Sequence, residues 1–242
     1  MAGQPVISVP FVGRQREEAY LRGELEAGRS VVLTGPYGIG RTSLVRHLAA
    51  DTVRQWAFVI ANFDHTPGEV WGDLFAALFP RAFKRQRGET GPAKWTRFRV
   101  LNQPAETRRR HVVVLHDVAR LTAPKLDLLR RVRERYQVIA IAEDFLPEAA
   151  RVAICQALWA WAPLRLTRLG PAATLTFFEQ CSRSHGFLWS AGEIRGLARA
   201  THGFPLGMRE AVEAEHRRRE SAWGRKGARI TPEPPASPPP DP

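Results

Sequence analysis

Cysteine is scarce in this sequence, which has only Cys155 and Cys181, in no spacing typical of a zinc site. A disulfide framework and a zinc centre are therefore not expected, and a reducing compartment, the cytoplasm, is the expected location. Long apolar runs are missing too, because none reaches the roughly 18 residues of a membrane span. Met1–Pro10 also lacks the basic start and apolar centre of a signal peptide. We expect neither membrane insertion nor secretion.

Acidic residues are few relative to basic ones: 24 Asp and Glu stand against 36 Lys and Arg, which gives a net charge of +12. A basic surface attracts polyanions, so a nucleic-acid partner is one hypothesis. A GC-rich genome that favours arginine codons, with a solvated basic surface, is the other. The apolar fraction of 44% is that of a globular protein, and 242 residues suffice for one large domain with a small appendage.

Strand-like and helix-like segments alternate through most of the chain. Apolar runs typical of buried strands occur at Ser30–Thr34, Ala57–Asn62, His111–His116, Gln137–Ile141 and Leu164–Leu169. Helical patterns lie around them at Gln15–Ala27, Thr42–Val53, Glu69–Leu78, Ala123–Tyr136 and Pro147–Trp161. This alternation predicts an α/β fold, a three-layer sandwich with a five-stranded, mostly parallel sheet between helices.

A glycine-rich segment joins the first expected strand to the next helix. Its spacing is that of a phosphate-binding P-loop, Gly-x-x-x-x-Gly-Lys-Ser/Thr, except that Arg41 replaces the lysine. Glycines let backbone amides turn toward a phosphate, and the helix N-terminus favours an anion. We therefore predict a P-loop NTPase that binds ATP, with Thr42 holding Mg²⁺. The expected nucleotide contacts are Gly35, Pro36, Tyr37, Gly38, Ile39, Gly40, Arg41, Thr42 and Ser43.

Arg41 is the expected catalytic cation, but a planar guanidinium is bulkier than the lysine ammonium it replaces. Positive charge is kept, while the fit to the transition state of phosphoryl transfer is expected to suffer. Binding should therefore be less affected than turnover. The alternative is a glycine-rich turn that binds nothing.

The last part of the chain has no strand signal. Helices are expected at Ala172–His185, Ala191–Thr201 and Leu206–Ala222, as a small C-terminal helical lid. The final twelve residues hold seven prolines, which neither propagate a helix nor pair in a sheet. The expected domains are a P-loop nucleotide-binding α/β domain at 1–169, a helical lid at 170–224 and a basic, then proline-rich disordered tail at 225–242.

Three segments resemble motifs of the AAA+/STAND ATPases. FVGRQREEAYL at Phe11–Leu21 is similar to the Phe-Val-Gly-Arg-Glu box that precedes the P-loop of that family. HVVVLHDVARL at His111–Leu121 resembles its second acidic motif, and THGFPLGMREAV at Thr201–Val212 resembles its Gly-x-Pro motif. The resemblance covers nearly the whole chain apart from the tail.

The resemblance also implies roles for single residues. In the family the first box backs the adenine, which implies base contacts from Val12 and Gly13. The Gly-x-Pro motif implies that Gly203 and Pro205 close over the nucleotide. Arg209 could then be a lid arginine that senses the terminal phosphate, but an exposed arginine on a basic helix is the favoured explanation.

The acidic motif departs from the family. Its register puts His116 at the acid that orients Mg²⁺ and Asp117 at the acid that polarises water. A shift by one makes Asp117 the magnesium ligand but leaves Val118 at the water-activating position. The polar sensor after the fourth strand would fall at Glu143, another departure. We expect Asp117 to act as catalytic and metal-binding acid, with slow or absent hydrolysis; a plain buried strand is the alternative.

Basic residues are concentrated in two segments. Arg81–Arg110 holds ten basic residues and two acids, interleaved with Phe83, Trp95 and Phe98, which predicts phosphate contacts and base stacking. A second run, His216–Arg229, extends the last helix. A solvated loop and a helix end stabilised by cations are the alternatives. No helix-turn-helix signature is visible, so we expect nucleic-acid binding that depends little on the nucleotide sequence.

Three functions remain open. The leading one is an ATP-binding regulator or adaptor, DNA-associated, whose assembly as a homo-oligomer or with a protein partner depends on ATP. The second is an active ATPase resembling the small helper ATPases of DNA transposition. The third is a scaffold that binds no nucleotide and acts through protein contacts.

Overall fold

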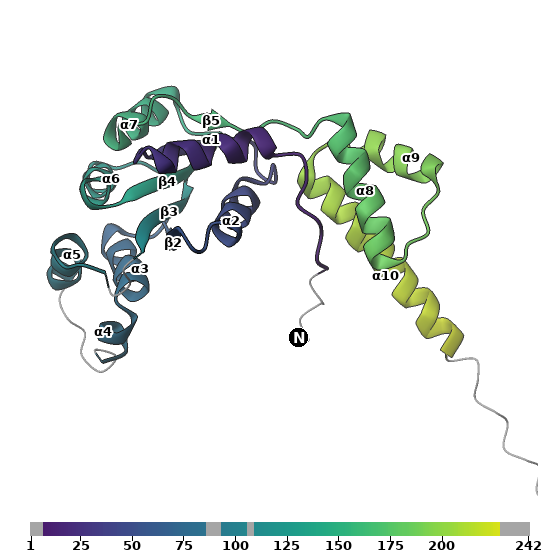
Figure 1. Ribbon diagram of the computed structural model, residues 1–242, viewed down its shortest axis with the longest axis horizontal. Helices are drawn as coiled ribbons and strands as arrows, with labels where there is room; N and C mark the ends of the chain where they lie inside the picture. The colour runs from purple at the N-terminus through teal and green to yellow at the C-terminus, as the bar shows by residue number, and fades with distance from the viewer. Residues whose placement is uncertain (1–6, 86–92, 106–108, 228–242) are drawn as a thin grey trace, which may run out of the picture.

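The computed structural model describes residues 7–85, 93–105 and 109–227 (Figure 1). Its strands pair in parallel in the order β2-β3-β4-β1-β5. They are β1 (Val31–Thr34), β2 (Trp56–Asn62), β3 (Arg110–Val118), β4 (Gln137–Ala142) and β5 (Leu164–Arg165). The predicted α/β fold with a five-stranded parallel sheet is confirmed.

The helices of the described residues follow the predicted pattern with two additions. They are α1 (Gln15–Glu26), α2 (Arg41–Asp51), α3 (Pro67–Leu78), α4 (Pro80–Arg85), α5 (Ala93–Asn102), α6 (Ala123–Arg135), α7 (Glu148–Leu158), α8 (Pro171–His185), α9 (Ala191–Thr201) and α10 (Pro205–Gly227). Helices α4 and α5 were not expected, and α10 continues past Ala222. None of these described helices is long and apolar enough to cross a membrane.

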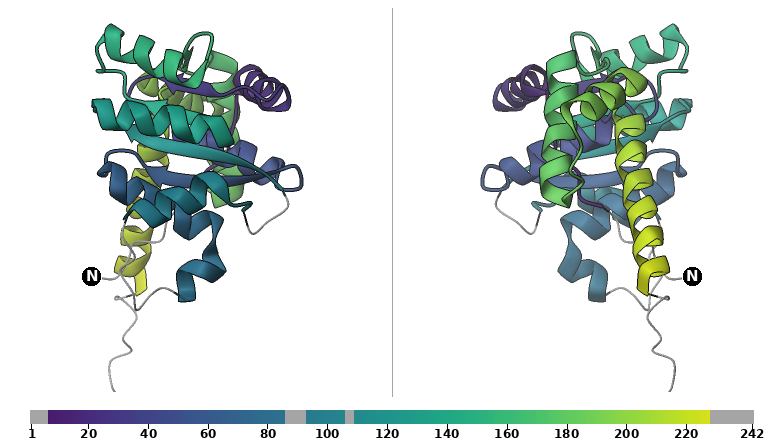
Figure 2. Two further views of the ribbon diagram at one scale, coloured as in Figure 1. Left: turned by 90° about the vertical axis from the view of Figure 1, so that its left-hand side faces the viewer. Right: turned by 90° about the vertical axis from the view of Figure 1, so that its right-hand side faces the viewer.

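Helices cover both faces of the sheet, as the two side views in Figure 2 show. Along β3 the side chains alternate: Val112 and Val114 join the cluster under α1 and α2, whereas Val113 and Leu115 join the cluster under α3, α5, α6 and α7. All four are almost completely buried. A strand covered on both faces is apolar throughout, which is why the sequence shows a continuous run.

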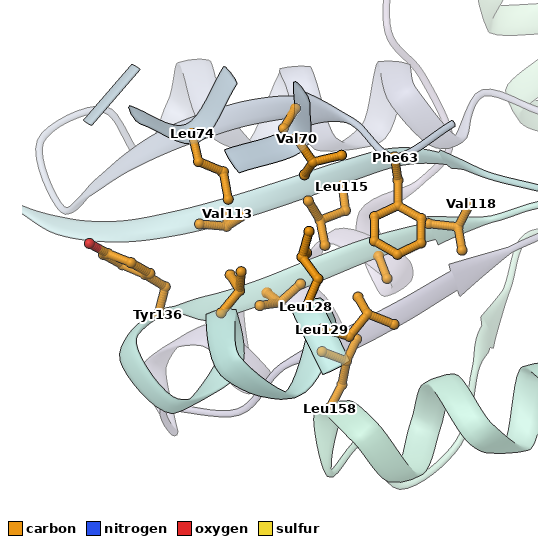
Figure 3. Close-up of a cluster of buried hydrophobic side chains, with 14 of the residues drawn as sticks. Phe63, Val70, Leu74, Val113, Leu115, Val118, Leu128, Leu129, Tyr136 and Leu158 are labelled. Carbon is orange, nitrogen blue, oxygen red and sulfur yellow. The ribbon is translucent and has the colours of Figure 1, made fainter. Parts of the chain in front are cut away.

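The larger of these clusters is drawn in Figure 3, where side chains of α3 and α6 pack with those of the strands on one face of the sheet. Phe63, just after β2, is fully buried there, and Val118 at the end of β3 packs in the same cluster. The Tyr136 hydroxyl donates a 2.8 Å hydrogen bond to the Val100 carbonyl, which ties the end of α6 to α5. The core thus extends to α5, one of the two helices that the sequence pattern did not predict.

Strand β5 is shorter than the predicted Leu164–Leu169. After Arg165 the chain makes one more contact with the sheet, from Leu166 N–H to the Thr34 carbonyl at 2.9 Å. It then turns away, and Leu169 N–H donates to the Gly203 carbonyl at 2.8 Å. The apolar side chains after Arg165 are buried without forming a strand: Leu166 packs in the cluster under α1 and α2, and Leu169 packs among the C-terminal helices.

The C-terminal helices α8, α9 and α10 enclose a separate apolar cluster. Its buried members are Leu169, Phe177, Phe178, Cys181, Phe187, Ile194, Met208 and Val212. Ile7, Val9 and Val12 from the start of the chain pack against it, so the N-terminal segment lies between the sheet domain and these helices (Figure 1). The proline-rich tail predicted for the last twelve residues lies outside the described residues.

We predict that Gly203→Ala lowers the free energy of unfolding by at least about 2 kcal/mol, because of left-handed backbone strain and overpacking. Gly203 has φ +67°, and a Cβ there would lie 2.2 Å from the Leu169 carbonyl oxygen. Gly207→Ala is the matched control: it lies in α10 with open space around the added Cβ, and should stabilise by up to about 1 kcal/mol. Urea unfolding measures both. Equal changes in unfolding free energy for the two variants would contradict the close packing of Gly203 against Leu169.

Candidate functional site

The glycine-rich loop between β1 and α2 has the backbone that its sequence predicts. Gly35, Gly38 and Gly40 all have positive φ angles, of +140°, +80° and +94°. A Cβ at Gly35 would lie 2.9 Å from the Leu166 carbonyl oxygen, and one at Gly38 would lie 2.7 Å from Leu206 Cβ. Larger residues are excluded by the conformation at all three positions and by close neighbours at two of them.

A cavity of about 490 Å³ opens over this loop, within the usual range for small-molecule sites. Its walls come from the N-terminal segment, the loop, the ends of β3 and β4, and helices α8 and α10. The predicted site residues that line it are Val12, Tyr37, Gly38, Ile39, Gly40, Arg41, Thr42, Ser43, Asp117 and Pro205. Gly13, Gly35 and Pro36 were also predicted as contacts but do not line it.

One end of the cavity is aromatic and apolar. The rings of Phe11 and His47 stack with centroids 4.1 Å apart and an interplanar angle of 21°. Both rings line the cavity, as do Phe177 and Met208 from the C-terminal helices. His47 was not among the predicted site residues, because it belongs to no sequence motif. A flat heterocycle fits such an end.

Gly13 supports the site from outside the cavity. It has φ +70°, and a Cβ there would lie 2.4 Å from the Cβ of Ala173 in α8. The neighbouring Arg14 is only 4% exposed. Its guanidinium donates to the Thr167 carbonyl at 2.7 Å and to the Ile39 carbonyl at 3.1 Å. The segment that resembles the family box therefore holds the glycine-rich loop against α8 and the end of β5.

Arg41 does not project freely into the cavity. Its Nη2 donates to both carboxylate oxygens of Glu143, at 2.8 Å each, and its Nη1 donates to the Ala142 carbonyl at 2.6 Å. The Arg41 and Glu143 side chains are 7% and 14% exposed. Arg41 and Glu143, which both depart from the family pattern, therefore form one nearly buried ion pair. Its charge-assisted hydrogen bonds are stronger than those between neutral groups.

Asp117 has a left-handed backbone, with φ +58°. The β3–β4 register is interrupted between Leu115 and Val118, so Asp117 lies in a bulge that turns its side chain toward the cavity. Strained backbone of this kind is concentrated at functional sites. His116 lies beside it, with Nδ1 2.7 Å from Asp117 Oδ2. Of the two acidic-motif positions, Asp117 alone lines the cavity.

A second cavity, of about 690 Å³, adjoins the first through three shared residues, Tyr37, Asp117 and Glu143. Its lining also includes the carboxylates of Asp64 and Asp144. Within the described part of the chain, no group of three or more His, Cys, Asp or Glu is placed to hold a metal ion. A cation held by Thr42 and Asp117 would therefore complete its shell with phosphate oxygens and water, as Mg²⁺ usually does.

Part of the basic segment 81–110 packs against the core. Arg97 lies 3.5 Å from Asp127 and over the Trp71 ring, and Arg99 lies over the Phe75 ring. Phe83 and Phe98 are 43% and 55% exposed. The predicted contacts of Lys84, Arg85, Arg87 and Trp95 fall on side chains outside the described residues.

The second basic run is also partly engaged within the chain. Arg218 and Arg219 pair with Glu215, and Arg219 donates to the Gly186 carbonyl at 2.9 Å. Arg209 lines the main cavity and pairs with Glu213 at 2.7 Å. Some of the arginines that the sequence assigns to a partner thus have structural contacts.

Comparison with known proteins places this arrangement in context. The model of the family described as "AAA ATPase domain" matches residues 10–145. The fold is similar to that of the ORC1 protein of Aeropyrum pernix in complex with DNA, with a TM-score of 0.62 at 18% identity over 93% of this chain and 66% of the other. No protein with a curated description matches the sequence.

Two further solved structures share the fold. The ORC2 protein of Aeropyrum pernix, in ADPNP and ADP complexes, gives a TM-score of 0.60 at 18% identity over 92% of this chain and 66% of the other. A variant of Thermotoga maritima RuvB gives 0.57 at 17% identity over 92% of this chain and 68% of the other. The chain thus spans about two thirds of each of these proteins.

Arg14→Ala should lower the free energy of unfolding by about 2–4 kcal/mol, because it leaves buried carbonyls without a donor. Arg16→Ala is the matched control, since Arg16 is exposed on α1 two residues away and should change stability by less than about 0.5 kcal/mol. Denaturant unfolding compares the two. A similar small effect for both would show that Arg14 does not hold the loop.

Proposed function

The chain belongs to the AAA ATPase domain family, whose model matches more than half of its length, and from that premise we propose a nucleotide-binding regulator or adaptor with weak hydrolysis. The observation that carries this proposal is the cavity over the glycine-rich loop. It joins a backbone cradle, the Thr42 hydroxyl and an aromatic end in one space of nucleotide size.

The lining residues fit ATP with Mg²⁺. The stacked Phe11 and His47 rings would pack against one side of the base, and the positive-φ glycines would turn amides toward the phosphates. Thr42 and Asp117 line the same space and would supply the two protein ligands of Mg²⁺. The bound cation would neutralise phosphate charge.

The site has fewer of the groups that hydrolysis needs than of those that binding needs. Phosphoryl transfer needs a cation on the terminal phosphate and a carboxylate that orients water. Arg41 is engaged by Glu143, and His116 stands where one of the two acids of the family motif would be. The remaining acid, Asp117, cannot serve both roles at once. We therefore infer slow turnover, with the active ATPase as the second function.

A regulatory role is supported by contacts between the loop and α10. Leu206 N–H donates to the Gly38 carbonyl at 3.1 Å, and Pro205 and Leu206 line the cavity. A nucleotide in this space would touch the loop and the C-terminal helices together, so occupancy would bias their relative position. We propose that these helices act as a lid, and that its position sets assembly as a homo-oligomer or with a protein partner.

The proposal also includes association with DNA. It is supported by the net charge of +12 and by the exposed Phe83 and Phe98 in the basic segment. The ORC1 structure is a complex with DNA, and at 18% identity its likeness to this chain is one of fold. Arg97 and Arg99 are used in packing, so the remaining basic residues of segment 81–110 would carry the contact.

Calorimetry with ATP and Mg²⁺ should show one site on the natural protein, and Thr42→Ala should weaken that binding about tenfold, the loss of roughly one charge-assisted contact. Ser184→Ala, an exposed hydroxyl on α8, is the control and should bind as the natural protein does. Phosphate release should be slow in all three. Absence of binding would favour the scaffold that binds no nucleotide.

Binding to duplex DNA should weaken steeply with salt, with a slope of log affinity against log salt of roughly −5 for six phosphate contacts. Charge reversal at Lys84, Arg85 and Arg87 should flatten that slope by about 2 to 3. The control reverses three exposed arginines outside both basic runs, Arg16, Arg130 and Arg195. If both triple variants change the slope equally, the effect is one of net charge and no DNA-binding segment exists at 81–110.

A further inference from the structure

The Arg41–Glu143 pair is fixed by the topology of the sheet. Strands β1 and β4 are neighbours, with Leu33 opposite Ile141. Arg41 begins the helix that follows β1 and its loop, and Glu143 is the first residue after β4. Glu143 N–H also donates to the Val118 carbonyl at 3.1 Å, which holds its backbone beside the end of β3. The carboxylate is therefore held at the phosphate end of the cavity.

The Glu143 carboxylate accepts the Arg41 hydrogen bonds that a terminal phosphate would otherwise accept. Both of its oxygens accept hydrogen bonds from Arg41 Nη2, at 2.8 Å each. A guanidinium binds carboxylates and phosphates through the same planar fork. Nη1 is used as well, by the Ala142 carbonyl at 2.6 Å. Glu143 therefore competes with a terminal phosphate for the guanidinium of Arg41, the cation at the P-loop lysine position.

The Glu143 carboxylate itself opposes an additional phosphate beside it. Glu143 and Asp117 both line the cavity here, and Arg41 neutralises only one of them. The exposed Arg46 and the Glu213-paired Arg209 line the cavity too. Arg41 and Glu143 are nearly buried, where charge interactions are screened less than at the surface. A third phosphate beside Glu143 would meet a like charge, and the Arg41 guanidinium is already held by that carboxylate.

We propose that the Arg41–Glu143 pair makes this site selective for nucleoside diphosphates over triphosphates. A diphosphate ends within the amide cradle and leaves the pair intact. A triphosphate binds only after Glu143 releases Arg41, and its affinity is reduced by the free energy of that release. The inference rests on the proposed nucleotide-binding function and specifies the ligand of the same site.

The test is calorimetry with ADP and with ATP, each with Mg²⁺, on the natural protein and on Glu143→Gln. The natural protein should bind ADP about tenfold more tightly than ATP, the equivalent of one charge-assisted hydrogen bond. Glu143→Gln frees the Arg41 charge and should raise ATP affinity about tenfold, with an ADP change below about threefold. Glu148→Gln, an exposed glutamate on α7, is the matched control and should change neither affinity.

A second variant guards against misfolding of the first, because an unpaired buried guanidinium destabilises a protein. Arg41→Lys combined with Glu143→Asn removes the carboxylate and replaces the fork with a flexible ammonium. It should bind ATP at least as tightly as ADP, and thermal unfolding confirms that each variant is folded. Equal ADP and ATP affinities in the natural protein, unchanged in both variants, would overturn the selectivity while nucleotide binding stands. Binding of neither nucleotide by any variant would overturn both proposals.

Discussion

The parallel pairing of β1 with β4 determines which side chains meet at the centre of the site. It brings the loop after β1 and the residue after β4 to the same edge of the sheet, so Arg41 and Glu143 face each other although they are 102 positions apart in the sequence. Pairing of β4 with β3 adds Asp117 to that edge. In a parallel sheet the carboxyl ends of the strands always share one edge, and ligand sites form there.

The rest of the site depends on close backbone approach. Gly13 lies against Ala173 and Gly38 against Leu206, so the C-terminal helices contact both the N-terminal segment and the loop. The buried Arg14 guanidinium links the loop to the chain after β5. A cavity formed in this way has walls from segments far apart in sequence, and its shape follows their relative position.

Local patterns predicted the parallel sheet, most helices and the glycine-rich loop, because burial on both faces and the needs of a phosphate cradle leave marks within a few residues. The misses have physical reasons. Leu166 is buried under α1 and α2 and Leu169 among the C-terminal helices, so the apolar run is longer than the strand. The Arg41–Glu143 pair and the Phe11–His47 stack depend on side-chain directions that only the tertiary structure sets.

Helix α10 gives the Leu206–Gly38 contact a mechanical consequence. It has 23 residues and begins at the cavity wall, so at 1.5 Å per residue it extends about 34 Å away from the loop. If the helix moves as a rigid body about its contact with Gly38, a small tilt there displaces its far end. A tilt of about 10° there would move the far end by about 6 Å, more than the 5.4 Å pitch of one helical turn. A tilt of about 10° beside the loop would thus become a displacement that a neighbouring molecule can distinguish.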